Sequence, residues 1–429
     1  MSNIPSVPGP GRAEPYRQYG SLIEAALPFC PSPIIPCFLG VLGVKSTMRN
    51  RWNILAFTVL CLVFAGMSLY LILHPDRTGV VPNYRNASTH WWASQNIYVS
   101  GTHGFLYAPS FAVLFTPFNL IQPAVLGEII WRLFGFGLFG WALWKLARVL
   151  NTQHGRLGIT APTFMYIVLL AVPASLASLN NGQTNLSLSA VLVLSALALR
   201  GEKWTVAALL LTAALILKPI ALAPCLLAFA VFSPVRGYLL GGMLGAVALG
   251  FLHPDLTYSW HQTVGFGHKL FDSYTPENLR VSDLFGIFQK ANVPTPFRVD
   301  TITRGLASLA ALWFCWWKYR RGHIPKASWA LWVGSCIILT VFNPRAETNS
   351  YVLISPLLAY VACGHLLDPQ GNKIAGWMLG LACIGLMCDG MGKTIYLATD
   401  VWLKPLIVLV VSPLLFRAPD SWRPEKIER

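Results

Sequence analysis

Long runs of apolar residues are the feature of this sequence that most restricts its fold. Many are close to the length of about 20 residues that an α-helix needs to cross a bilayer. Backbone amides must be paired inside lipid, so such runs fold as helices. The sequence therefore predicts an all-α membrane protein with about 12 transmembrane helices. The predicted spans are residues 54–74, 126–148, 158–178, 185–199, 204–217, 219–233, 237–253, 303–318, 327–343, 351–366, 374–391 and 399–416.

The composition supports lipid as the solvent for much of the chain. Of its 429 residues, 55% are hydrophobic and only 11% are charged, whereas soluble domains carry about 25% charged residues. The formal charge of +15 does not indicate nucleic-acid binding, because the basic residues separate apolar runs and form no single stripe. Most of the nine cysteines lie inside these runs, so we expect no disulfide framework.

The basic residues also predict the orientation, because cytoplasmic loops of membrane proteins are enriched in Lys and Arg. They fall on one side if the chain alternates regularly, and we therefore expect both termini in the cytoplasm. Residues 1–47 are rich in proline and form either a cytoplasmic tail or a segment upstream of a start at Met48. The membrane domain is then 48–416, followed by a cytoplasmic tail at 417–429.

Two long loops, 75–125 and 254–302, fall on the opposite, outer side. In the first loop, residues 84–92 are amphipathic and aromatic, as is typical of an interfacial helix. An apolar stretch between Pro109 and Pro117 is too short to span and predicts a re-entrant or interfacial helix. These elements belong to the outer face of the protein.

Polar and ionisable side chains from distant parts of the sequence map to this outer face, where such groups are costly and commonly functional. They either cap helices and solvate loops one by one, or they share one polar cavity. A cavity with several cations suits the phosphate of a lipid-linked donor, and a carboxylate suits a general base. Three histidines, His253, His261 and His268, follow no standard ligand spacing, so no metal site is predicted.

Three stretches make the sequence resemble glycosyltransferase family 87, which has the GT-C membrane fold. The first is 84–118, which includes Gly-Phe-Leu-Tyr-Ala-Pro at residues 104–109. The second is Asn-Gly-Gln-Thr-Asn-Leu at residues 181–186, followed by Leu-Lys-Pro at 217–219. The third is Asn-Pro-Arg at residues 343–345, which leads to Tyr-Val-Leu-Ile-Ser-Pro at 351–356.

This resemblance implies a metal-independent transferase of a bacterial inner membrane. Such an enzyme uses a polyprenyl-phosphate sugar and inverts its anomeric centre, with a catalytic Asp in the first outer loop. Family members commonly carry an Asp just before the aromatic helix. This chain has Asn83 near that place, and Asp76 seven residues earlier. The family's His pair is also missing, and residues 347–350 (Glu-Thr-Asn-Ser) stand in that region. Asp76 is therefore the first candidate for the base and Glu347 the second, although Asp76 could merely cap a helix or pair with Arg77.

The sequence thus predicts a glycosyltransferase that moves mannose or another sugar from a polyprenyl-phosphate donor to a glycan or glycolipid acceptor outside the cytoplasm. It needs no cofactor and no nucleic acid, and its partners are the lipid-linked donor, the acceptor and membrane lipids. The alternatives are a secondary transporter, whose internal repeats are not seen, and an inactive relative. The predicted catalytic residues are Asp76 and Glu347. The predicted substrate-binding residues are Arg77, Asn83, Tyr84, Arg85, Tyr107, Asn181, Gln183, Asn185, Lys218, Arg280, Arg345 and Asn349.

Overall fold

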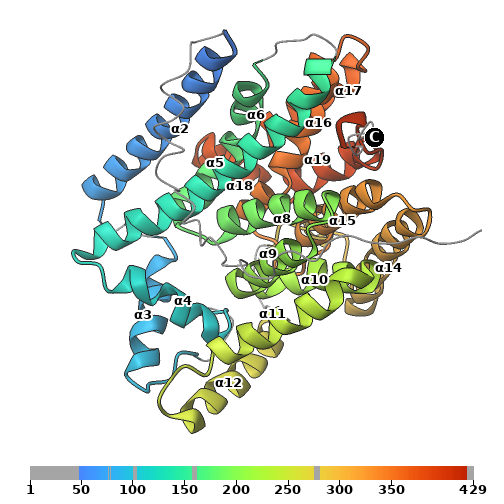
Figure 1. Ribbon diagram of the computed structural model, residues 1–429. Helices are drawn as coiled ribbons and strands as arrows, with labels where there is room; N and C mark the ends of the chain where they lie inside the picture. The colour runs from blue at the N-terminus through green and yellow to red at the C-terminus, as the bar shows by residue number, and fades with distance from the viewer. Residues whose placement is uncertain are drawn as a thin grey trace, which may run out of the picture. The chain divides into compact units, whose positions relative to one another are not determined.

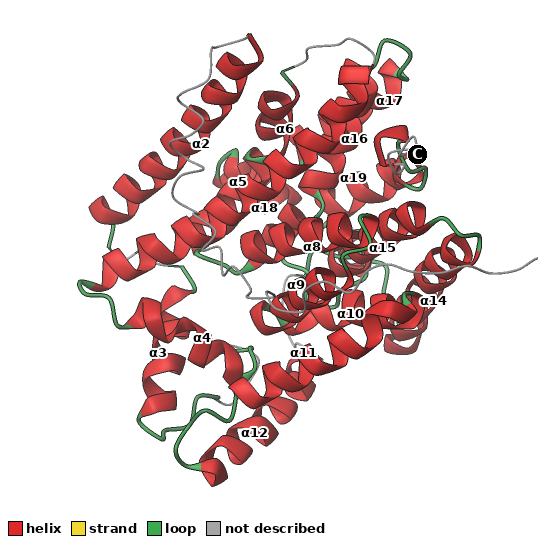
Figure 2. Ribbon diagram, viewed as in Figure 1, coloured by secondary structure: helices red, strands yellow, loops and turns green. Residues whose placement is uncertain are grey.

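The computed structural model describes residues 48–75, 77, 79–99, 104–156, 162–274 and 281–422. Within these ranges the chain forms helices and no strand (Figure 2). The sequence-based prediction of an all-α membrane protein is confirmed at this level.

In the part of the chain that the structure describes, three helices are long and apolar enough to cross a membrane. They are Arg51–Leu73 within α2 (Met48–Leu73), Ala124–Thr152 within α5 (Ala124–Arg156), and Thr163–Asn181. Two bent pairs raise the number to at most five, and the pair formed by Pro219–Val231 and Ser233–Leu249 is bent by 116°.

About 12 complete spans are not confirmed, although helical segments occur at all twelve predicted ranges (Figure 1). Several are short: α8 (Asn185–Arg200) has 16 residues and α16 (Ser355–Leu367) has 13. At 1.5 Å per residue these helices are about 20–24 Å long, which is less than the roughly 30 Å of a hydrocarbon core. Prolines shorten several of them, because Pro cannot donate the backbone hydrogen bond that continues a helix.

The other helices follow the order of the chain. They are α6 (Thr163–Ala171), α7 (Leu176–Asn181), α9 (Trp204–Leu217), α10 (Leu222–Val231), α11 (Arg236–Leu249), α12 (Leu256–Tyr274), α13 (Leu284–Lys290), α14 (Phe297–Arg320), α15 (Ile324–Thr340), α17 (Lys373–Gly385), α18 (Lys393–Thr399) and α19 (Leu403–Val411). Short 3₁₀ turns join several of them, among which η4 (Thr348–Leu353) precedes α16.

The first predicted outer loop contains α3 (Val81–Trp92) and α4 (Pro109–Asn119), which pack against each other. This confirms the expected amphipathic and short apolar helices. Tyr84 of α3 makes edge contacts with the rings of Phe111, Phe115 and Trp131. The aromatic side chains of this loop therefore form a core of their own against α5, beyond any role as interfacial anchors.

Helix α8 lies at the centre of the bundle and is buried along almost its whole length. It packs against α5, α9 and α15 (Figure 1). Because α7 ends at Asn181 and α8 begins at Asn185, residues 182–184 form the turn that leads into this central helix.

The second predicted outer loop also contains helices, α12 and α13, which the sequence-based interpretation treated only as a loop. Residues 281–284 are tied to the segment between α15 and η4. The amide of Ser282 donates to the carbonyl of Ala346 at 2.7 Å, and that of Leu284 donates to Val341 at 2.9 Å. The hydroxyl of Tyr351 donates to the carbonyl of Ser282 at 2.8 Å. These bonds fix the strand-like link that precedes α13 against the loop after α15.

Candidate active site

Four predicted site residues form a continuous chain of hydrogen bonds. Nε2 of Gln183 donates to Oε2 of Glu347, and Nδ2 of Asn185 donates to Oε1 of Gln183, each at 2.8 Å. Nζ of Lys218 donates to Oδ1 of Asn185, also at 2.8 Å. We call these four residues the polar chain. It joins a carboxylate to a cation through two amides, using three segments that are far apart in the sequence.

The turn that carries Gln183 and Asn185 is fixed by α5. Gly182 ends α7 with a φ of +63°, a left-handed conformation that favours glycine. Its carbonyl accepts a hydrogen bond from Nε1 of Trp131 at 2.9 Å. Arg132 donates to the carbonyls of Leu179 at 3.1 Å and Asn180 at 3.0 Å. These bonds satisfy the free carbonyls at the end of α7 and direct the next residues toward α8.

Lys218 occupies the break between α9 and the next turn. It is followed by Pro219 and is extended, with φ −160° and ψ 126°, because the residue before a proline is disfavoured in the helical region. Burial lowers the pKa of Lys218, the charge of Glu347 raises it, and the charge of Arg345 lowers it further. Both charged groups therefore act on the Lys218 ammonium.

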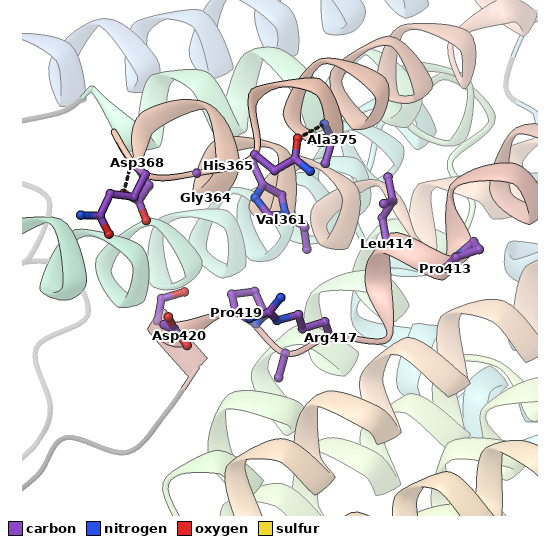
Figure 3. Close-up of a pocket in the computed structure, with 15 residues that line it drawn as sticks. Val361, Gly364, His365, Asp368, Ala375, Pro413, Leu414, Arg417, Pro419 and Asp420 are labelled. Atoms are coloured by element: carbon purple, nitrogen blue, oxygen red, sulfur yellow. Dashed lines mark hydrogen bonds between the residues drawn. The ribbon is translucent and has the colours of Figure 1, made fainter.

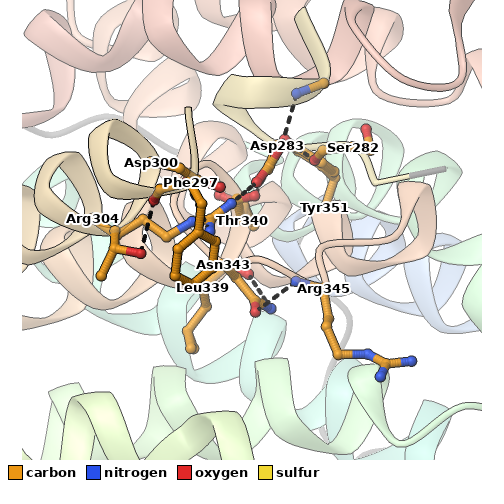
Figure 4. Close-up of polar contacts among 12 residues, drawn as sticks. Ser282, Asp283, Phe297, Asp300, Arg304, Leu339, Thr340, Asn343, Arg345 and Tyr351 are labelled. Carbon is orange, nitrogen blue, oxygen red and sulfur yellow. Dashed lines mark hydrogen bonds and ion pairs between the residues drawn. The ribbon is translucent and has the colours of Figure 1, made fainter. Parts of the chain in front are cut away.

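Arg345 links the loop after α15 to the second predicted outer loop. Its Nη1 donates to the carbonyl of Ser273 in α12 at 2.9 Å. Its backbone amide donates to Oδ1 of Asn343 at 3.1 Å, and Figure 4 shows these two residues side by side, with the guanidinium pointing away from Asp283. Burial lowers the pKa of Arg345, and Glu347 raises it. The guanidinium is thus half-buried and within the field of the Glu347 carboxylate.

Glu347 is exposed and has two structural functions besides its bond to Gln183. It is the N-cap of η4, and it forms a capping box with Ser350, whose Oγ accepts from the amide of Glu347 at 3.3 Å. This arrangement fixes the side chain at the end of the polar chain. A carboxylate held in this way can accept a proton from an acceptor hydroxyl.

The loop that carries Glu347 is anchored by residues that the sequence-based interpretation did not select. Lys404 is fully buried; it pairs with Asp389 at 2.7 Å and donates to the carbonyl of Thr348 at 3.1 Å. Oγ of Ser178 donates to the carbonyl of Asn349 at 2.8 Å. Asn349 is therefore held at the site through its backbone, and substrate binding by its side chain stays a prediction.

Two predicted tyrosines lie beside the polar chain. The hydroxyls of Tyr84 and Tyr107 are 2.7 Å apart, and that of Tyr107 is 3.5 Å from Oγ1 of Thr184. Thr184 stands between Gln183 and Asn185. Burial raises the pKa of both tyrosines, so they remain neutral and act as hydrogen-bonding or stacking groups.

Several other predicted residues contact the site less directly or lie apart from it. Asn181 ends α7, and its carbonyl accepts from the amide of Val80 at 3.0 Å. Arg85 is half-buried and interacts electrostatically with Glu128 of α5. Arg77 and Asn83 are exposed, and within the described ranges neither makes a side-chain contact with the polar chain.

Asp76 and Arg280 lie outside the described residues. Asp76 stands three residues before Gly79, whose φ is +66°. A Cβ on Gly79 would meet the backbone of Asn181. The chain that follows Asp76 in sequence therefore reaches the end of α7, two residues from Gln183.

Buried charges in the helices form a second group that the sequence-based interpretation missed. Glu128 and Arg132 of α5 are 3.3 Å apart and almost completely buried. Their spacing of four residues within an apolar helix was a usable signal, since charged residues in such helices are rare and paired. Arg132 supports the turn of Gly182, so this pair positions the site.

A third buried cluster fixes the start of α13 (Figure 4). Oδ1 of Asp283 accepts from the amide of Gly286 at 2.8 Å, and its Oδ2 accepts from Arg304 at 2.5 Å. Arg304 also pairs with Asp300 at 2.7 Å. This cluster holds residues 281–284 and, through Ser282 and Ala346, the loop that carries Arg345.

The sequence matches one known protein family. The model of glycosyltransferase family 87 matches residues 105–356, which is more than half of the chain. Comparison with curated proteins finds no match. The chain belongs to glycosyltransferase family 87 and is a membrane glycosyltransferase. The matched range contains the whole polar chain, Tyr107 and Arg345, whereas Asp76, Arg77, Asn83, Tyr84 and Arg85 precede it.

Proposed function

We propose that this glycosyltransferase moves a sugar from a polyprenyl-phosphate donor to a glycan or glycolipid acceptor on the non-cytoplasmic side of a bacterial inner membrane. The observation that carries the proposal is the polar chain, which joins the carboxylate of Glu347 to the ammonium of Lys218. Transfer from a lipid phosphate requires a group that takes a proton and groups that neutralise the departing phosphate. This arrangement supplies both kinds of group within one network.

The cationic part of the network suits the leaving group. In the proposed reaction an acceptor hydroxyl attacks the anomeric carbon while the bond from that carbon to the phosphate oxygen breaks. The polyprenyl phosphate leaves with the electron pair of that bond. Lys218 and Arg345 would stabilise the negative charge that develops on the phosphate, and Arg can do so with two parallel hydrogen bonds. Tyr107 is half-buried and offers a hydroxyl and a ring edge for the sugar, whereas Tyr84 is buried and holds the hydroxyl of Tyr107.

The proton of the acceptor goes to a carboxylate. Asp76 remains the first candidate, because it precedes the segment that contacts Asn181. Glu347 is the second candidate, and its exposure and fixed position favour it as well. A positioned general base typically contributes about 10²–10⁴-fold to the rate, so the residue that serves as base can be identified by a neutral isostere.

The paired variants Asp76→Asn and Glu347→Gln test this assignment in a deletion strain complemented with each form. Mass spectrometry would measure the pool of polyprenyl-phosphate sugar and the acceptor glycan. We expect the variant without the base to accumulate donor and lack product, as the deletion strain does. Asp272→Asn, which removes an exposed carboxylate of α12, is the matched control and should restore product.

Each other outcome has a definite meaning. Product in Asp76→Asn and none in Glu347→Gln would assign the base to Glu347. Full product in both variants would refute a carboxylate base. An unchanged donor pool in the deletion strain would refute the polyprenyl-phosphate donor and favour an inactive relative.

A further inference from the structure

Helices α15 and α16 extend from the candidate active site to residues 417–422, which lie at the opposite ends of these two helices. The C-terminal end of α15 and the N-terminal end of α16 flank the loop of Arg345 and Glu347. Their opposite ends, near Ile324 and Leu367, adjoin the segment that follows α19. Trp422 in that segment is fully buried, and its Nε1 donates to Oγ of Ser328 at 3.0 Å. Residues 417–422 are thus packed against the bundle at this end.

Two cavities open beside this segment and share the side chain of Arg417. The larger has a volume of about 430 Å³, and Figure 3 shows Arg417 among its lining residues with His365, Asp368 and Asp420. It contains groups of both charges. The smaller cavity, of about 140 Å³, differs in its chemistry.

The smaller cavity has three cationic side chains and no acidic one in its lining. Its lining residues are Lys318, Lys326, Trp329, Phe416, Arg417 and Ala418. Within the described part of the chain none of the three cations has a carboxylate at ion-pair distance. Three positive charges around one cavity repel one another unless an anion joins them. Its volume is about ten times the roughly 10–15 Å³ that one water needs, so it has room for a phosphate group.

Exposed aromatic side chains lie in the lining of this cavity and on α14, the helix that carries Lys318. Phe416 of the lining is 44% exposed, and Trp313 and Trp316 of α14 are 61% and 46% exposed. Nζ of Lys318 lies 4.3 Å from the centroid of the Trp317 ring. Exposed tryptophans beside Lys and Arg are typical of the level of lipid headgroups. These side chains therefore favour a lipid headgroup as the ligand of the cavity, with acyl chains along α14.

We propose that the cavity lined by Lys318, Lys326 and Arg417 binds the phosphate of an anionic phospholipid, whose acyl chains lie along the exposed face of α14. This site is separate from the candidate active site and does not depend on the proposed reaction. Arg417 provides a planar group for two phosphate oxygens, and the two lysines provide point charges. Basic pockets between membrane helices are a recurrent form of headgroup site.

The double variant Lys326→Gln/Arg417→Gln tests the site, because both side chains are at least partly exposed and their loss should leave the fold intact. The matched control is Arg51→Gln/Lys203→Gln, which removes two exposed charges from the same predicted face, away from the cavity. Native mass spectrometry of the full chain would measure retention of phosphatidylglycerol, phosphatidylethanolamine or inorganic phosphate, each added alone and in competition.

We expect the wild type and the control to retain phosphatidylglycerol in preference to phosphatidylethanolamine. The Lys326→Gln/Arg417→Gln variant should bind phosphatidylglycerol about tenfold more weakly or worse, since it loses two charge-assisted contacts. Equal retention by this variant and the wild type would overturn the proposal, as would equal loss in the control. Displacement of phosphatidylglycerol by millimolar inorganic phosphate would overturn the lipid as the ligand and assign the cavity to soluble phosphate.

Discussion

Replacement of Lys218 by glutamine should weaken donor binding without unfolding the protein. In the structure Nζ of Lys218 donates to Oδ1 of Asn185, which is fully buried. Lys218→Ala would leave that oxygen without a donor, at a cost of about 1–3 kcal/mol in stability. Glutamine retains N–H donors and removes only the charge, so Lys218→Gln separates the electrostatic function from the structural one.

The size of the effect follows from the contact that is lost. A hydrogen bond that involves a charged group contributes about 1.5–3 kcal/mol, which corresponds to about 10- to 150-fold in affinity. We therefore expect Lys218→Gln to raise the Kd of a short-chain polyprenyl-phosphate sugar by a factor in this range. Lys218→Arg, which keeps the charge, should retain most of the affinity.

Isothermal titration of the purified variants in detergent would measure this Kd, and their melting curves would show that they are folded. Lys290→Gln removes one exposed charge from α13, on the same predicted face, and serves as the matched control. Wild-type affinity in a folded Lys218→Gln variant would refute our account of the phosphate site. An equal loss in Lys290→Gln would show that the effect is a general one of net charge.

Three further predictions follow from the described contacts. Burial lowers the pKa of Lys218, so the affinity of the wild type for the donor should fall as the pH rises through that lowered pKa. Titrations of Lys218→Arg should show no such fall, and a flat profile in the wild type would contradict this prediction. Tyr351→Phe removes the bond to the carbonyl of Ser282 at 2.8 Å and should destabilise the protein by about 1–3 kcal/mol in a thermal unfolding assay, whereas an unchanged Tm would argue against that bond. A reporter fused after Lys326 should be cytoplasmic and one after Thr102 should be outside, so a cytoplasmic signal at Thr102 would overturn the predicted orientation.

The fold was predictable from the sequence to the extent that hydrophobicity determines it. Each predicted span contains a helical segment among its described residues, because apolar runs and Pro positions act locally. The lengths of those helices were less predictable. The bend of 116° between Pro219–Val231 and Ser233–Leu249 lies at Phe232, which is extended before Ser233 and Pro234. Hydrophobic periodicity does not give the size of such an angle.

Part of the site was predictable for a similar reason. Gln183, Asn185 and Lys218 stand at the ends of apolar runs, where polar side chains are costly and commonly functional. The structure joins them to Glu347 by hydrogen bonds. The residues that support them are inside the runs. Lys404 of α19 pairs with Asp389, which follows α17. The two helices pack against each other, and the spacing of these residues in the sequence does not predict such a contact.

The contacts of other predicted residues could not be predicted from the sequence. The sequence shows that a residue is polar and near a helix end, but not which way its side chain points. Arg85 interacts with Glu128 of α5, and Asn349 is held by its carbonyl. The direction of a side chain depends on the packing of its helix, which single-sequence reasoning does not supply.

The most direct test of the proposed function is transfer by the purified protein. Wild-type protein in liposomes that contain a polyprenyl-phosphate sugar would be given a glycan acceptor. Mass spectrometry and NMR would then quantify the released polyprenyl phosphate and the anomeric configuration of the product. We predict one polyprenyl phosphate released for each sugar transferred, with inversion at the anomeric carbon, and loss of both signals in Lys218→Gln. Transfer without release of polyprenyl phosphate, or full transfer in folded Lys218→Gln, would contradict the account.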